Sequence, residues 1–289
     1  MKKIICMAFV CFTMLMGAKA QVNIVEEKRN PRSECWEDSA KNYIEKGRRG
    51  DKTAFEKLAE CYHEGHGVER NFINMVFMYL QASERGGLSM EEYMARYEVN
   101  DPDRLLFDAM NDIEQKKFDD ATARLEKLKA MNQPSSITIQ AFLAAEMDKD
   151  QEKSERLLLE ASEKGCSLGQ LLYAKSAEER KDDTEYKKRL ESITANIPMT
   201  YNQLGRVYWE EGREIDSEEL MNQAKDCFRK ADEYACLMKQ NARRLLYCYK
   251  KDVESGKAIC DSVELEHVQV IACVDSFSKE EIVSYEYEE

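Results

Sequence analysis

The stretch GDKTAFEKLAECYHEGHGVERNFINMVFMYLQASERG, residues 50–86, decides the fold. Its small residues Ala54 and Ala82 are placed so that two paired helices can approach each other closely. Gly65 can take the left-handed conformation that ends a helix, and Asn71 can cap the helix that follows. The stretch therefore predicts two antiparallel helices joined by a short turn.

Helical patterns continue along the rest of the chain. Segments such as DATARLEKLKAM, EKSERLLLEASEKG and DSEELMNQAKDCFRKADEY carry apolar residues at three- and four-residue spacing, with charges on their other faces. The four prolines lie in or near breaks between such segments, and clear strand alternation is absent before VQVIACV at Val268. The chain therefore predicts an all-α protein with about a dozen helices of roughly 10 to 20 residues.

One short motif occurs twice. ASERG at residues 82–86 returns as ASEKG at residues 161–165, and half of that shift is about 40 residues. Repeats built from a pair of helices are roughly 34 to 47 residues long. Because each pair buries its apolar face only against a neighbouring pair, the echo predicts an α/α solenoid of stacked antiparallel helix pairs.

Residues 50–86 resemble a Sel-one-like repeat, a relative of the tetratricopeptide repeat, and they align with its pattern without a gap. The sequence departs from the family pattern at Ala59, Asn71, Met75, Met78 and Ser83. The matching positions are Gly50, Ala54, Leu58, Tyr62, Gly65, Gly67, Val68, Tyr79, Ala82 and Gly86.

A second signature, in residues 201–231, resembles the tetratricopeptide repeat itself, with a longer gap between its two halves. The extra residues belong either to a lengthened second helix or to a longer loop. The matching positions are Tyr201, Leu204, Gly205, Tyr208 and Gly212, then Ala224, Phe228 and Ala231, and a weaker half-match comprises Phe118, Ala121, Leu125 and Leu128.

The two ends of the chain differ from the repeats. Residues 1–20 have two lysines, an apolar run and the small-x-small signal Ala-Lys-Ala, which predicts a cleaved signal peptide and export to the periplasm or the medium. We expect the solenoid to span residues 21–254 and to remain outside the membrane. Residues 255–289 are predicted to form a C-terminal segment with a short strand and an acidic tail. The formal net charge of −13 makes a nucleic acid partner unlikely.

Eight cysteines follow the predicted signal peptide, and the sequence leaves their state open. An even number in an exported protein allows disulfides, most readily in the C-terminal third. The absence of regular spacing fits small buried hydrophobic residues equally well. For Cys61 we expect burial and no partner.

The octapeptide CYHEGHGV, residues 61–68, raises the question of a metal site. His63, Glu64 and His66 occupy positions that the repeat pattern leaves free, and the two histidines lie on either side of the helix-ending Gly65. They therefore do not share a helical face as zinc-binding histidines do, and a third ligand would have to come from elsewhere. The sequence predicts a helix end here, with no metal and no cofactor.

Enzymatic chemistry has little support in the sequence. Ser276-Phe277-Ser278-Lys279 has the Ser-x-x-Lys spacing of penicillin-recognising enzymes, but neither Ser-Asp-Asn nor Lys-Thr-Gly accompanies it. Some cysteine-rich Sel-one-like proteins are linked to penicillin binding, and a hydrolase or penicillin-binding role is the alternative. Their repeats place cysteine where this chain has Ser83 and Ser162. A non-enzymatic scaffold is the leading expectation.

The resemblance implies a concave groove lined by the first helix of each pair, which binds a protein or peptide. In the first repeat, Phe55 and Leu58 should pack inward, and the opposite face should be acidic and favour a partner with a basic segment. In the later repeat, a cation and a large aromatic side chain should provide anchors. The predicted groove residues are Glu56, Glu60, His63, Asn202, Arg206 and Trp209.

Overall fold

The computed structural model describes residues 36–193 and 197–254, which form thirteen helices and contain no strand. The helices are α2 (Trp36–Arg48), α3 (Lys52–Glu64), α4 (Phe72–Glu84), α5 (Met90–Met94), α6 (Pro102–Glu114), α7 (Phe118–Ala130), α8 (Ser135–Glu146), α9 (Gln151–Glu163), α10 (Ser167–Glu179), α11 (Asp183–Ile193), α12 (Thr200–Glu214), α13 (Glu218–Glu233) and α14 (Lys239–Glu254). The predicted all-α fold is confirmed. The expected signal peptide, C-terminal strand and acidic tail lie outside the described residues.

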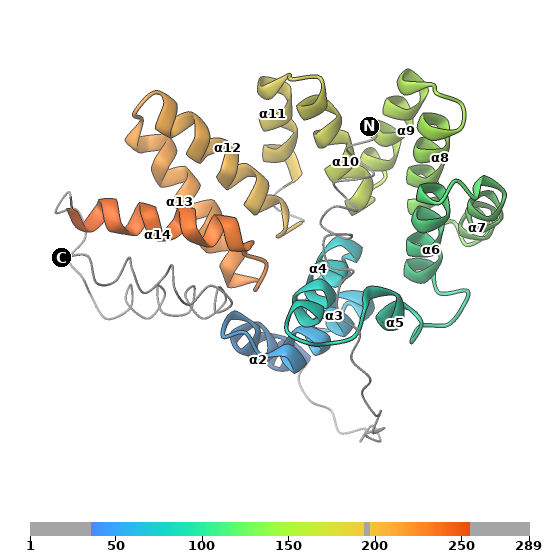
Figure 1. The fold of residues 1–289 in the computed structure, drawn as a ribbon, viewed down its shortest axis with the longest axis horizontal. Helices are drawn as coiled ribbons and strands as arrows, with labels where there is room; N and C mark the ends of the chain where they lie inside the picture. The colour runs from blue at the N-terminus through green and yellow to red at the C-terminus, as the bar shows by residue number, and fades with distance from the viewer. Residues whose placement is uncertain (1–35, 194–196, 255–289) are drawn as a thin grey trace.

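Consecutive helices pack as antiparallel pairs, namely α3 with α4, α6 with α7, α8 with α9, α10 with α11 and α12 with α13 (Figure 1). Neighbouring pairs stack through contacts such as those of α9 with α10 and of α11 with α12. This arrangement confirms the predicted solenoid of helix pairs.

The first repeat has the turn chemistry that its sequence predicts. Gly65 ends α3 with a φ of 74°, and its N–H donates to the carbonyl of Cys61 at 2.8 Å. The Asn71 side chain caps α4 by accepting the N–H of Asn74 at 3.0 Å. Met75, which stands where the repeat pattern has alanine, is fully buried, so the second helix accommodates the larger side chain.

The motif repeated at residues 82–86 and 161–165 has the same local structure at both places. Gly86 and Gly165 both have positive φ and follow the second helices α4 and α9. Each glycine N–H donates to a carbonyl three residues back, and the next residue, Gly87 or Cys166, donates to the carbonyl of the residue five positions back. Both helices therefore end in the same Schellman-type cap, in which glycine avoids the steric cost of a left-handed backbone.

The later hairpin resolves the alternative that its sequence leaves open. Helices α12 and α13 contain 15 and 16 residues, against 13 each for α3 and α4, and only residues 215–217 separate them. The extra residues therefore lengthen the helices rather than the loop. Gly205 allows the close approach of the pair, because a Cβ there would lie 2.5 Å from the Phe228 ring.

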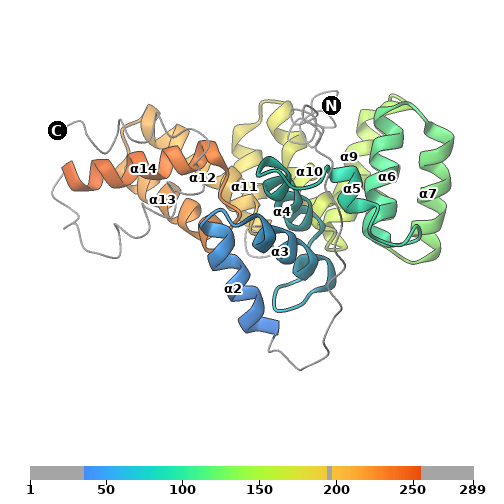
Figure 2. The same cartoon turned by 60° about the horizontal axis from the view of Figure 1, so that its bottom comes forward.

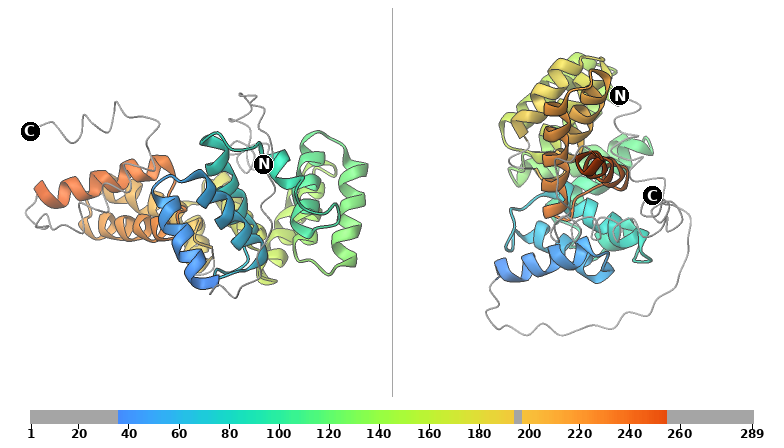
Figure 3. Two further views of the ribbon diagram at one scale, coloured as in Figure 1. Left: turned by 90° about the horizontal axis from the view of Figure 1, so that it is seen from below. Right: turned by 90° about the vertical axis from the view of Figure 1, so that its left-hand side faces the viewer.

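The first repeat lies beneath the arc formed by the later helices. Figure 1 shows α6 to α14 following a curved path, with α2 to α4 on its inner side. In Figure 2 and in the left view of Figure 3, α2 to α4 cross the middle of this row of helices, and in the right view of Figure 3 they lie beneath it. Helix α4 contacts α10, and α2 contacts α13. One hydrophobic core joins residues of α3 and α4 to residues of α10, α12 and α13. The inner side of the arc is therefore occupied by the chain's own first repeat.

A buried ion pair stabilises the contact between α2 and α13. Arg48 of α2 donates to Asp232 Oδ2 of α13 through Nε at 3.1 Å and Nη2 at 2.9 Å. The Asp232 side chain is 1% exposed, and burial raises its pKa although Arg48 acts to lower it. Nearby, the Cys236 thiol lies 3.9 Å from Asn74 Oδ1 of α4. Residues distant in sequence thus hold the two ends of the solenoid together.

Four described cysteines, Cys61, Cys166, Cys227 and Cys236, are buried free thiols. Burial is the largest cause that raises the pKa of Cys61 to about 11 and of Cys227 to about 12. The expected burial of Cys61 is confirmed. For these four residues the structure favours the small buried hydrophobe over the disulfide.

Candidate functional site

Three of the predicted groove residues share one face of α3. Glu56, Glu60 and His63 follow each other at intervals of four and three residues, so they lie on one side of the helix. Phe55 and Leu58 are 1% and 0% exposed. The predicted inward packing of these two apolar residues is confirmed. The polar face, however, meets other parts of the same chain.

Glu56 is bonded within the chain, whereas Glu60 stays at the surface. The hydroxyl of Tyr93, in α5, donates to Glu56 Oε1 at 2.6 Å. Glu60 accepts from Lys57 on its own helix at 3.1 Å, and its side chain is 37% exposed. The open acidic face predicted for the first repeat is therefore reduced to Glu60, because α5 folds over the position of Glu56.

His63 contacts the start of α6. Its Nδ1 lies 2.8 Å from Asp103 Oδ2, and its Nε2 lies 3.3 Å from Asp101 Oδ2. Asp101 caps α6 by accepting the N–H groups of Asp103 and Arg104 on Oδ1. Arg70 adds a second donor to Asp103 Oδ2 at 3.0 Å. The three residues His63, Asp101 and Asp103 are called the His63 cluster below.

The carboxylates decide the charge of the ring. Burial acts to lower the pKa of His63, but the hydrogen bonds and negative charges of Asp101 and Asp103 outweigh it and raise the pKa to about 9. Burial likewise acts to raise the pKa of Asp101, and its bonds to His63 and to the backbone of Arg104 lower it overall. In the absence of a bound cation, the imidazole is therefore positive at neutral pH.

Asn202 does not lie on an open groove, and that prediction is wrong. Its side chain is fully buried, where its amide donates to the carbonyl of Cys236 at 2.5 Å and accepts the N–H of Met238 at 2.8 Å. Asn241 also donates to Asn202 Oδ1 at 3.1 Å. One amide has both a donor and an acceptor to offer, so Asn202 joins α12 to the segment that enters α14.

Arg206 and Trp209 remain close to the surface of α12. Arg206 is paired with Glu178 of α10, and with Glu210 at 3.1 Å. Two guanidinium groups lie over the Trp209 ring, Arg213 at 4.7 Å and Arg244 at 5.1 Å from the ring centroid.

Helix α14 completes this arrangement. The Tyr247 ring lies edge-on to Trp209, with the centroids 6.2 Å apart, and Tyr247 is 36% exposed. Arg213 also lies 5.9 Å from the Tyr247 ring. We call Trp209, Arg213, Arg244 and Tyr247 the α12–α14 patch. Partly exposed tryptophan, tyrosine and arginine side chains of this kind are the residues that most often anchor protein interfaces.

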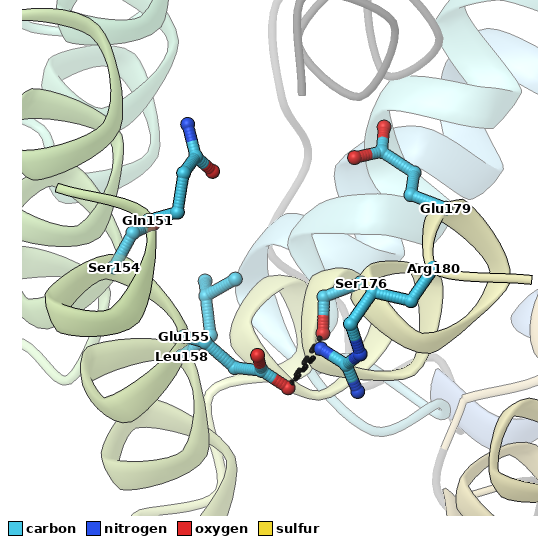
Figure 4. Close-up of a pocket in the computed structure, with 7 residues that line it drawn as sticks. All are labelled: Gln151, Ser154, Glu155, Leu158, Ser176, Glu179 and Arg180. Carbon is cyan, nitrogen blue, oxygen red and sulfur yellow. Dashed lines mark hydrogen bonds and ion pairs between the residues drawn. The ribbon is translucent and has the colours of Figure 1, made fainter. Parts of the chain in front are cut away.

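A cavity of about 250 Å³ lies between α9 and α10 (Figure 4). Inside it, Glu155 is paired with Arg180, and Ser176 donates to the same carboxylate oxygen at 3.4 Å. Arg189 adds a further ion pair at 3.4 Å. The positive charges of Arg180 and Arg189 offset the negative charge of Glu155. The residues that line the cavity are Gln151, Ser154, Glu155, Leu158, Ser176, Glu179 and Arg180.

The sequence analysis does not identify several residues of the His63 cluster and of the α12–α14 patch. The string Asp101-Pro102-Asp103 has a helix-capping residue before a proline, which signals a helix start. Nothing in a single sequence shows that this start meets His63 across the first repeat. Arg244 and Tyr247 lie outside the repeat signatures, so pattern matching does not reach them.

The chain was compared with known protein families, curated proteins and solved structures. No model of a known protein family matches the chain, and no curated protein does. A crystal structure of a protective antigen present in uropathogenic Escherichia coli strains, described as displaying an SLR fold, aligns with 85% of this chain at 14% sequence identity and a TM-score of 0.38. The alignment covers 59% of that protein, so this chain spans about three fifths of its length.

Proposed function

We propose that this chain is an exported, non-enzymatic repeat scaffold that binds a protein or peptide. A helical solenoid exposes a large surface for its length, and binding is its usual task, although a fold alone does not fix a function. The α12–α14 patch carries the proposal, because it gathers two arginines, a tryptophan and a partly exposed tyrosine from two helices. None of the helices in residues 36–193 and 197–254 is both long and apolar enough to cross a membrane.

The patch defines the chemistry of the ligand segment that it receives. Arg244 donates to Asn241 Oδ1 at 2.6 Å and to Glu210 Oε1 at 3.5 Å. The exposed guanidinium of Arg213 therefore supplies the N–H donors, which suit carboxylate or carbonyl oxygens. Tyr247 adds apolar surface beside it. The ligand segment on this patch therefore presents hydrogen-bond acceptors next to an apolar side chain.

We also propose that a basic segment of the ligand lies over the first repeat. Only Glu60 supports it now, because Glu56 is bonded to Tyr93 and His63 faces two aspartates. Glu60→Lys is the appropriate variant, since Glu56→Lys would break a bond within the fold. A surface charge contributes about 1 kcal/mol or less, so we expect at most a fivefold loss of affinity, and a smaller one at high salt.

The absence of catalysis is also a proposal. The raised pKa of Cys61 leaves its thiol protonated and unreactive at neutral pH, which supports a structural role. Ser276 and Lys279 lie outside the described residues. Covalent labelling by a fluorescent penicillin that is lost in Ser276→Ala would contradict the proposal.

The test of binding uses affinity capture from periplasmic extract and culture fluid, followed by affinity measurement with the captured partner. The patch variant is Arg213→Glu with Tyr247→Ala, and both side chains are exposed. The matched control is Arg229→Glu with Tyr234→Ala, which makes the same changes at exposed positions on and after α13. Loss of interface anchors costs about 2 kcal/mol, so the patch variant should bind roughly 30-fold more weakly than the control. Equal affinity of the two variants would contradict the proposed ligand surface.

A further inference from the structure

The His63 cluster has the composition of a metal site. One imidazole nitrogen and two carboxylate oxygens, from the end of α3 and the start of α6, all lie within 4.8 Å of one another. The side chains of His63, Asp101 and Asp103 are between 11% and 17% exposed, so the group is shielded yet reachable from solvent. Mixed imidazole and carboxylate donors are suited to Zn²⁺ and related transition-metal ions.

The two ring nitrogens of His63 have different surroundings. Nδ1 lies 2.8 Å from Asp103 Oδ2, a usual length for a charge-assisted hydrogen bond. Nε2 lies 3.3 Å from Asp101 Oδ2, which is long for such a bond. Two ligands held tetrahedrally at about 2.0–2.1 Å from one zinc ion are themselves roughly 3.4 Å apart. The distance between Nε2 and Asp101 Oδ2 therefore fits two ligands of one metal ion. The distance between Nδ1 and Asp103 Oδ2 fits a hydrogen bond that orients the ring.

Neighbouring residues hold the side chains of His63 and Asp101 in place without a bound ion. Asp101 uses Oδ1 for the two backbone N–H groups of its helix cap, which turns Oδ2 toward His63. The Tyr97 ring lies 4.1 Å from the imidazole, between ring centroids. A carboxylate that accepts the remaining N–H of a ligating histidine fixes its tautomer and strengthens it as a ligand, and Asp103 is in that position.

We propose that the His63 cluster binds one divalent transition-metal ion, with His63 Nε2 and Asp101 Oδ2 as ligands and Asp103 as the orienting carboxylate. Solvent completes the coordination. Three features limit the affinity. The ion must displace the proton that Nε2 carries at neutral pH. The N-terminal dipole of α6 disfavours a cation, and Arg70 competes for Asp103 at 3.0 Å. We therefore expect a dissociation constant for Zn²⁺ on the order of micromolar. This site would tie α3 to α6 and is independent of the proposed ligand surface.

The experiment titrates the chain, first stripped with a chelator, with Zn²⁺ alone in a calorimeter. The wild-type protein should bind about one equivalent. His63→Ala and Asp101→Asn should each weaken binding at least about tenfold, and Asp103→Asn should weaken it about tenfold, as loss of an orienting carboxylate does. Asp101→Asn is the cleanest variant, because asparagine still caps a helix while the anionic ligand is lost.

The matched control is His66→Ala. His66 belongs to the same octapeptide and lies 2.7 Å from Glu64 through Nδ1, so it tests for adventitious zinc binding by this turn. His66→Ala should bind zinc as the wild type does, and circular dichroism should show unchanged helix content in Asp101→Asn. The proposal is overturned if the wild type binds no zinc up to about 100 micromolar, if Asp101→Asn binds it equally well, or if His66→Ala loses as much affinity as His63→Ala.

Discussion

The first repeat and the α12–α13 hairpin share one architecture but differ in what their surfaces do. The polar face of α3 meets α5 and α6, so Glu56 and His63 bond to residues of the same chain. On the corresponding side of α12, Arg206 pairs with Glu178 of α10 and the Trp209 ring contacts α14, whereas Arg213 and Tyr247 stay exposed. The residues that match the repeat pattern thus predict the helical hairpin. The helix packed next to the hairpin decides whether its polar surface is exposed to a ligand.

The largest effect should come from weakening the contact between α2 and α13. Arg48→Ala leaves the Asp232 carboxylate buried without its guanidinium, and breaking a buried pair in this way costs about 3–5 kcal/mol. Denaturant unfolding measures the loss. Asp232→Asn in the Arg48→Ala background should recover part of it, because the uncompensated charge is removed.

The same variant should respond to pH in a defined direction. Burial raises the pKa of Asp232 in the folded protein, so folding favours its protonated form. Stability from this group is therefore present at low pH and is lost as the pH rises through the folded pKa. Removing Arg48 raises that pKa further. The stability difference between wild type and Arg48→Ala should shrink as the pH falls from 7 toward about 4, and a difference that grows would contradict this assignment.

A moderate effect should distinguish how the two hairpins use glycine. In α12, a Cβ at Gly205 would lie 2.5 Å from the Phe228 ring, which is fully buried. We expect Gly205→Ala to destabilise the protein by about 1–3 kcal/mol through overpacking. Thermal unfolding at fixed pH measures it, and an unchanged midpoint would show that the hairpin is looser than described.

In the first repeat, glycine serves the turn instead. Gly65 has a φ of 74°, and a Cβ there would meet neighbours only at 3.6 Å or beyond. Gly65→Ala should therefore cost only about 1 kcal/mol, from backbone strain rather than from a clash. Gly65→Asn should cost less, because asparagine tolerates this conformation. Equal losses for alanine and asparagine would argue against strain as the cause.

Local rules in the sequence predicted local structure well. The capping residue Asn71, the helix-ending Gly65 and the buried Leu58 act within one hairpin, where spacing along the chain fixes spacing in space. The contacts of His63 with Asp101 and of Arg48 with Asp232 depend on how hairpins pack, and no pattern within a repeat encodes that. Asn202 was misplaced for the same reason, since only the path into α14 shows that its amide is enclosed.

The position of α2 against the end of α13 is the central claim, and a designed disulfide tests it most directly. A Cβ at Gly47 would lie 3.5 Å from the Cβ of Ala235, within the range that a disulfide requires. Gly47→Cys combined with Ala235→Cys should form an intramolecular bond under mild oxidation, identified by mass spectrometry of non-reduced peptides and absent from either single variant. If the two residues form no bond, or bond only between separate chains, α2 does not pack against the end of α13 as described.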